Sequence, residues 1–162
     1  CAGGMTAVCH MPVQWENCDL AHPFCMQIDV DGLLGGHSGM EIIKQRANAN
    51  KVLGRTLKAI QAVADIRLVS INGGKKDNAI PRAAQAVFVA ETEKQPAIQR
   101  AVQTLQAAIS HEYEVSDPDV TLKMKECTEA VVETMNRVSG DAIIDALFLL
   151  PNGVQKMSDA MP

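Results

Sequence analysis

The stretch "GLLGGHSGMEIIKQRANANKVLGR", residues 32–55, places a single histidine, His37, in a glycine-rich loop directly before an amphipathic pattern. An imidazole in such a loop can donate or accept a hydrogen bond close to neutral pH, so it can bind an anion or a carbonyl oxygen of a ligand. A solvated histidine in a surface turn is the alternative. The residues of this stretch leave both interpretations open.

A second candidate is Asn78, in "INGGKKDNAIPR" at residues 71–82. Its carboxamide carries both a donor and an acceptor and could orient a small polar ligand. An asparagine directly before a strand is also typical of turn chemistry, and Lys75-Lys76-Asp77 beside it indicates a solvated loop. Asn78 therefore becomes a site candidate only if the fold brings it to His37.

The composition of the 162 residues excludes several classes of function. A net charge of −4 and an aromatic content of 3% argue against nucleic-acid binding. No apolar run approaches the ~20 residues that a membrane span needs. The five cysteines form no C-x-x-C pair, which favours reduced thiols in a cytoplasmic protein. Neither H-x-D nor H-E-x-x-H occurs, so we expect no metal site within this chain.

Hydrophobic periodicity predicts four strands and three helices. The strands are expected at residues 26–30, 66–71, 82–90 and 120–127. A first helix is expected at about residues 40–63, with Ser38 as its N-cap and Glu41 completing a capping box. A second helix is expected with Pro96 in its first turn, and a last helix at about residues 139–150.

The order strand, helix, strand, strand, helix, strand is the ferredoxin-like βαββαβ arrangement. We therefore predict an α+β fold, a four-stranded antiparallel sheet in the order 4-1-3-2 with two helices on one face, plus flanking arms. Residues 22–150 would form this domain, residues 1–21 an extended arm, and residues 151–162 a return segment. The chain begins at Cys1 and ends in "SDAMP", and we expect it to be a piece cut from a longer protein.

This topology brings the two candidate residues together. The first strand ends at the glycine loop of His37, and the third strand begins just after Asn78. Because these strands are neighbours in the order 4-1-3-2, both residues should lie at the same end of the sheet. The N-terminus of the first helix opens there too, and its free N–H groups favour an anion. An imidazole, a carboxamide and helix N–H groups together would suit a carboxylate or an oxyanion.

The motifs "GGHSG", "NGG" and "NAIPR", in this order, resemble those of the bacterial aminoacyl-histidine dipeptidases, peptidase D or carnosinase-like enzymes among the two-zinc exopeptidases. The likeness extends from "CAGG" to "PNGV", residues 1–154. It implies that this chain is the inserted lid and dimerisation domain of a cytoplasmic enzyme that hydrolyses Xaa-His dipeptides such as carnosine. Two zinc ions, or cobalt or manganese, would lie in a catalytic domain outside this chain, and the chain alone would be inactive.

The resemblance also implies roles for single residues. His37 would stabilise the oxyanion of the reaction in the active site of the partner subunit, and Asn78 would hydrogen-bond the substrate. Some relatives bind the substrate carboxylate with an arginine at the far end of the strand after Asn78. Glu91 stands at that position here, so this role is not transferred, and Arg82 is only a weak candidate for it.

Two other functions stay open at this stage. The chain could be a stand-alone ferredoxin-like module that binds a small carboxylate at the same end of the sheet, or a purely structural dimerisation module. The second strand, "IRLVSI", would lie at the edge of the sheet, where an unpaired apolar strand tends to associate. We therefore predict a symmetric homodimer through this strand and the first helix.

Overall fold

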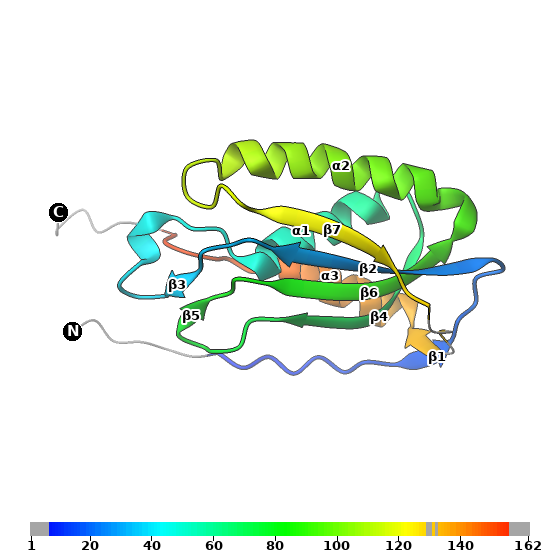
Figure 1. Cartoon of the computed structure of the whole chain (residues 1–162). Coiled ribbons are helices and arrows are strands. Elements are labelled where there is room, and N and C mark those ends of the chain that lie inside the picture. Colours follow the sequence, from blue (N-terminus) through cyan, green and yellow to red (C-terminus); the bar gives the residue numbers. More distant parts are fainter. Residues whose placement is uncertain (1–6, 129–130, 132, 156–162) are drawn as a thin grey trace.

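The computed structural model describes residues 7–128, 131 and 133–155 (Figure 1). Its strands are β1 (Trp15–Asn17), β2 (Pro23–Asp31), β3 (Gly36–His37), β4 (Ile66–Gly73), β5 (Ala79–Ile80), β6 (Ala84–Glu91), β7 (Thr121–Glu126) and β8 (Glu133–Met135). Its α-helices are α1 (Ala49–Gln61), α2 (Gln95–Glu112) and α3 (Arg137–Leu149). Within these described residues, no helix is long and apolar enough to cross a membrane.

Four strands form the central antiparallel sheet in the order β4-β6-β2-β7. Numbered along the chain, this is the predicted order 4-1-3-2, and the predicted α+β class is confirmed. Alternation along β2 separates the two faces of the sheet, because successive side chains point to opposite sides. Met26, Ile28 and Val30 are buried against the helices, whereas Gln27 and Asp29 lie on the open face.

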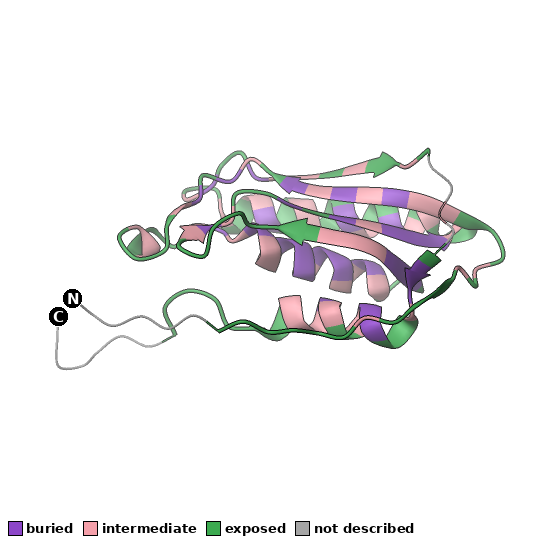
Figure 2. Ribbon diagram, turned by 90° about the horizontal axis from the view of Figure 1, so that it is seen from below, coloured by how far each residue is buried: buried purple, intermediate pink, exposed green. Residues whose placement is uncertain are grey.

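Helix α1 lies at the centre of the helical layer. It packs against the sheet, α2 and α3, and none of its residues is exposed. Figure 2 shows α1 between the sheet and α3. The helix α3 therefore packs on this side in addition to the two helices that we predicted for it. A Cβ on Gly54 would lie 2.9 Å from Leu147 Cβ, which shows how closely the two helices approach. Lys51 Nζ donates to the last carbonyls of α3, where a cation also complements the helix dipole.

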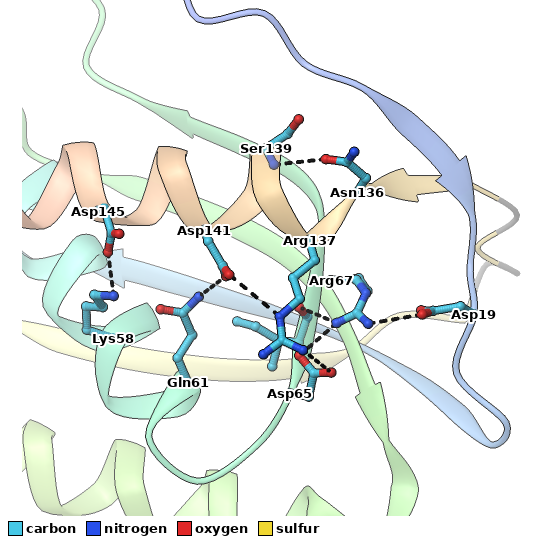
Figure 3. Close-up of polar contacts among 11 residues, drawn as sticks. Asp19, Lys58, Gln61, Asp65, Arg67, Asn136, Arg137, Ser139, Asp141 and Asp145 are labelled. Carbon is cyan, nitrogen blue, oxygen red and sulfur yellow. Dashed lines mark hydrogen bonds and ion pairs between the residues drawn. The ribbon is translucent and has the colours of Figure 1, made fainter.

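Polar contacts join the flanking segments to this layer (Figure 3). The guanidinium of Arg67 on β4 is buried and pairs with Asp65 at 2.7 Å and with Asp19 of the N-terminal arm at 3.1 Å. Arg137 of α3 reaches Asp65 at 3.5 Å and Asp141 at 3.8 Å. β1 of the arm pairs with β8, the strand directly before α3. The arm and α3 are therefore held at the same end of β4.

The predicted start of the first helix is wrong. Ser38 is not a helix cap, and residues 42–44 form only a single 3-10 turn. This turn ends at Gln45, whose φ of 51° is left-handed and incompatible with a continuing α-helix. Met40 and Ile43 are each 79% exposed, so they do not continue the buried face of the helix that we predicted over residues 40–63. The helix begins at Ala49, after Asn48, whose side chain accepts from the Asn50 N–H as an N-cap does.

Candidate functional site

His37 and Asn78 lie on neighbouring segments at the end of the sheet. The chain after β2 forms β3, which pairs with β5, and His37 stands opposite Ala79. The Ser38 N–H donates to the Asn78 carbonyl oxygen at 3.0 Å. Figure 1 shows this short β3–β5 ribbon extending beyond the central sheet on the β2 and β6 side. The predicted meeting of the two loops is thus observed, and an additional ribbon that the sequence pattern did not reveal joins them.

The imidazole of His37 is held by its own loop. Nδ1 accepts hydrogen bonds from the backbone N–H groups of Gly39 at 3.1 Å and Met40 at 3.3 Å. An Nδ1 that accepts cannot carry the ring proton, so this hydrogen-bond pattern assigns the proton to Nε2. Because the side chain is exposed, Nε2–H is free to donate to a ligand.

Glu41 also stabilises the loop of His37. Its carboxylate accepts from the His37 backbone N–H at 2.9 Å and pairs with Lys44 at 2.8 Å and Arg46 at 3.2 Å. The hydrogen bond from Lys44 and then that from the His37 N–H lower the pKa of Glu41 to about 2. Arg46 also donates to the Gly35 carbonyl oxygen. Both the backbone and the ring of His37 are therefore fixed by neighbouring groups.

His37 and Asn78 both line one open groove, whose floor is the open face of the sheet. The groove measures about 1260 Å³, above the ~300–1,000 Å³ of an enclosed small-molecule pocket, because it is open to solvent on one side. Five basic side chains and three acidic ones line it: Lys75, Lys76, Arg82, Lys123 and Lys125, with Asp29, Asp31 and Glu41. This excess of positive charge favours an anionic ligand.

The helix N–H groups expected at this site are already occupied. The Ala49 N–H donates to the Pro81 carbonyl oxygen at 3.1 Å, and the Asn50 N–H donates to the Asn48 side chain at 2.9 Å. The start of α1 does lie at this end of the sheet, since a Cβ on Gly73 would meet the Asn50 side chain. Its first donors nevertheless stabilise the fold and do not face the groove as a free anion site. Of the three expected groups, the imidazole and the carboxamide remain.

Sequence reasoning missed Asp117. Its side chain is fully buried, and its two carboxylate oxygens accept from the Leu34 N–H at 2.8 Å and the Ala47 N–H at 2.7 Å. Leu34 and Ala47 stand at the two ends of the segment that carries His37, so one carboxylate holds both ends of that segment. The stretch "SDPD" around Asp117 is typical of a turn and contains no signal for such a long-range contact.

Two further candidates from the sequence lie in different places. Arg82 is exposed at the groove, and a Cβ on Gly35 would lie 2.5 Å from its Cγ, so its side chain lies beside the loop of His37. Glu91 lies at the other end of β6. Its carboxylate accepts from the N–H groups of Ala21 at 2.9 Å and His22 at 3.1 Å, a structural contact with the arm.

Three comparisons with known proteins bear on this site. A family model described as a peptidase dimerisation domain matches residues 28–117. The chain is 31% identical over 159 residues to the cytosol non-specific dipeptidase of Escherichia coli strain K12, covering 98% of the chain and 32% of that protein. It superposes on the crystal structure of aminoacylhistidine dipeptidase from Vibrio alginolyticus with a TM-score of 0.85 and 31% identity, covering 92% of the chain and 30% of that structure.

A more distant match shows the fold alone. The crystal structure of a putative aminohydrolase from methicillin-resistant Staphylococcus aureus superposes with a TM-score of 0.51 at 14% identity, covering 68% of the chain and 30% of that structure. In each of these comparisons the chain spans about a third of the length of the protein it matches.

Proposed function

Because this chain belongs to the peptidase dimerisation domain family, we propose that it is the lid and dimerisation domain of a dipeptidase and contributes His37 and Asn78 to its active site. The observation that carries this proposal is the fixed imidazole of His37. The His37 side chain is exposed, and it lines the same groove as Asn78, which carries an excess of basic side chains.

His37 would act as a hydrogen-bond donor to the transition state. When water attacks a peptide carbonyl, negative charge develops on the carbonyl oxygen, and a preorganised N–H stabilises this oxyanion more than the uncharged substrate. The two backbone hydrogen bonds to Nδ1 fix the ring before substrate arrives, so little reorganisation is needed. Asn78 would orient the substrate from the same groove through its carboxamide.

The described residues hold no ligand set for the metal ions of such an enzyme. Among the residues that the structure describes, no three His, Cys, Asp or Glu side chains gather as a metal site. We propose that two zinc ions, or cobalt or manganese, are bound by the part of the parent protein outside this chain, where they would activate the attacking water. The chain would then supply only His37 and Asn78 to the reaction.

The names of two relatives support a proposal for the substrate class and the location. One relative is named an aminoacylhistidine dipeptidase and the other a cytosol non-specific dipeptidase. We propose that the parent enzyme hydrolyses dipeptides of the Xaa-His type, such as carnosine, in the cytoplasm. The basic side chains of the groove would suit the carboxylate that every dipeptide carries.

We propose a homodimer through the edge of β4. Among the described residues, β4 pairs in the central sheet only with β6, and such an unpaired outer edge is a surface on which a second copy could associate. The first helix, which we expected to extend this interface, has no exposed residue because α3 covers its outer side. The helical contact beside β4 is therefore assigned to α3. In this dimer, His37 would serve the active site of the partner subunit.

The test is His37→Ala in the full-length parent enzyme. Loss of one oxyanion donor lowers kcat by about 10²–10³-fold. KM and the bound metal should stay close to the wild-type values, because His37 is expected to contact the substrate mainly in the transition state. His111→Ala is the matched control, since His111 is 86% exposed on α2, away from the groove. Unchanged turnover of His37→Ala would remove this residue from the mechanism.

Mixed dimers test whether His37 acts across the interface. One subunit carries His37→Ala, and the other carries a substitution of a metal ligand outside this chain. If His37 serves the partner, the intact catalytic domain and the intact His37 meet in one of the two sites, and activity returns in the mixture. If His37 serves its own subunit, the mixture stays as inactive as either variant alone.

A further inference from the structure

Two cysteines stand opposite each other at the end of the sheet remote from His37. In the register of β2 and β7, Met26 pairs with Glu126, and the next pair outward is Cys25 with Cys127. The Cys127 N–H donates to the Cys25 carbonyl oxygen at 3.0 Å, so the antiparallel pairing extends to this pair. Their side chains therefore leave the same face of the sheet.

This position fits the geometry of a disulfide. Directly opposed residues of antiparallel strands have Cα atoms ~4.5–5.5 Å apart, and disulfides span Cα separations of ~4.4–6.8 Å. The two thiols also interact, and this interaction contributes to the pKa of Cys25. Burial first, and then the hydrogen bond and charge of Cys127, raise the pKa of Cys25 to about 12. Both residues are half-buried, which leaves partial access for a small reagent.

We propose that Cys25 and Cys127 form a reversible disulfide when the protein meets a low-molecular-weight disulfide of the glutathione type. The Cys127 thiolate attacks one sulfur of the oxidant, whose S–S bond breaks and releases one thiol. The Cys25 thiolate then attacks the Cys127 sulfur of this mixed disulfide and expels the second thiol. The two protons lost by the protein reside on the two released thiols, and the oxidant gains the two electrons.

The order of attack follows from the surroundings of the two thiols. Cys25 is the poorer first nucleophile, because its raised pKa keeps it protonated at neutral pH. Burial, the largest cause of the raised pKa of Cys25, persists in the mixed disulfide, but the hydrogen bond and charge of Cys127 no longer add to it, and the Cys127 sulfur lies directly opposite. The product would join β7, an edge strand of the central sheet, covalently to β2.

The test uses the reduced chain incubated with excess oxidised glutathione and examined by intact mass and peptide mapping without reductant. We expect a loss of about two hydrogen masses, a peptide that joins Cys25 to Cys127, and reversal by dithiothreitol. Cys25→Ser should leave Cys127 as a mixed disulfide with glutathione, whereas Cys127→Ser should leave Cys25 largely reduced, because burial keeps the pKa of Cys25 raised. Cys18→Ser, the control, should keep the internal disulfide.

Two outcomes overturn the proposal. One is glutathione addition at Cys9 or Cys18 in the wild-type chain while Cys25 and Cys127 stay reduced. The other is an internal disulfide that maps to any other pair of cysteines. Because the pair lies at the end of the sheet remote from His37, oxidation should leave the kcat of the parent enzyme within about twofold. This inference does not depend on the proposed function.

Discussion

Replacing Asp117 tests whether one buried carboxylate holds the segment that carries His37. Its two oxygens accept from the Leu34 and Ala47 N–H groups, and Asp117 and Ala47 are both buried. A hydrogen bond to a charged group contributes ~1.5–3 kcal/mol, so removing both bonds with Asp117→Ala should lower the free energy of unfolding by roughly 3–6 kcal/mol.

Asp117→Asn keeps the shape but offers only one acceptor oxygen. Its NH₂ group then faces an N–H donor, one hydrogen bond is lost, and a buried donor is left without a partner. Leaving a buried donor without a partner costs ~1–3 kcal/mol, so we expect a destabilisation of roughly that size, smaller than that of Asp117→Ala. Asp119→Asn is the matched control, because this aspartate is exposed two residues away.

Urea unfolding of the three variants measures these differences, and amide hydrogen exchange locates them. The Leu34 and Ala47 amides should exchange faster in Asp117→Asn than in the wild type. The exchange rates of amides in α2 should change only as far as the global free energy of unfolding changes. Surface substitutions usually change the free energy of unfolding by no more than ~0.5 kcal/mol. If the free energies of unfolding of Asp117→Asn and Asp119→Asn differ by less than this amount, the assigned role is refuted. Unchanged exchange at Leu34 and Ala47 would refute it as well.

The remaining predictions concern pH and backbone strain. The hydrogen bond from Lys44 leads the effects that lower the pKa of Glu41 from 4.5 to about 2, so this side chain should favour the folded loop above about pH 4.5 and lose that effect as the pH falls toward 2. A carboxyl carbon NMR titration of Glu41 with a midpoint near 4.5 would contradict the contacts described. Gly32→Ala should cost about 2–4 kcal/mol, because φ is +80° and its Cβ would lie 1.9 Å from the Asp119 carbonyl oxygen. Gly153→Ala, with φ of +74° and open space around it, should cost less in the same urea assay, and equal costs would mean that the contact with Asp119 relaxes freely.

Much of the fold could be predicted from local pattern. The alternation of apolar and polar residues in β2 and β7 located both strands, and the order of elements predicted the order of strands in the sheet. The start of the first helix could not be predicted in this way. Met40 and Ile43 continue the helical spacing of apolar residues, yet both are exposed. The left-handed backbone of Gln45 and the long-range hydrogen bond from the Ala47 N–H to Asp117 prevent a helix there. Neither feature can be detected in the local spacing of apolar residues.

The candidate site also has features that the sequence predicts and features that it does not. The meeting of His37 and Asn78 depends only on which strands are neighbours, so topology was sufficient to predict it. The use of the α1 N–H groups depends on their actual partners, Pro81 and Asn48, which no spacing rule identifies. The packing of α3 over α1 requires close contact at Gly54, and a glycine within a helix predicts nothing about its partner.

The state of the His37 ring distinguishes between two chemical roles. A general base needs a ring nitrogen with a free lone pair directed at the substrate. Here the lone pair of Nδ1 accepts from the Gly39 and Met40 N–H groups, a pattern that assigns the ring proton to Nε2. Moving that proton to Nδ1 would place an N–H against two other N–H donors. This hydrogen-bond pattern therefore fits the proposed role of His37 as a donor to developing negative charge better than proton abstraction by His37.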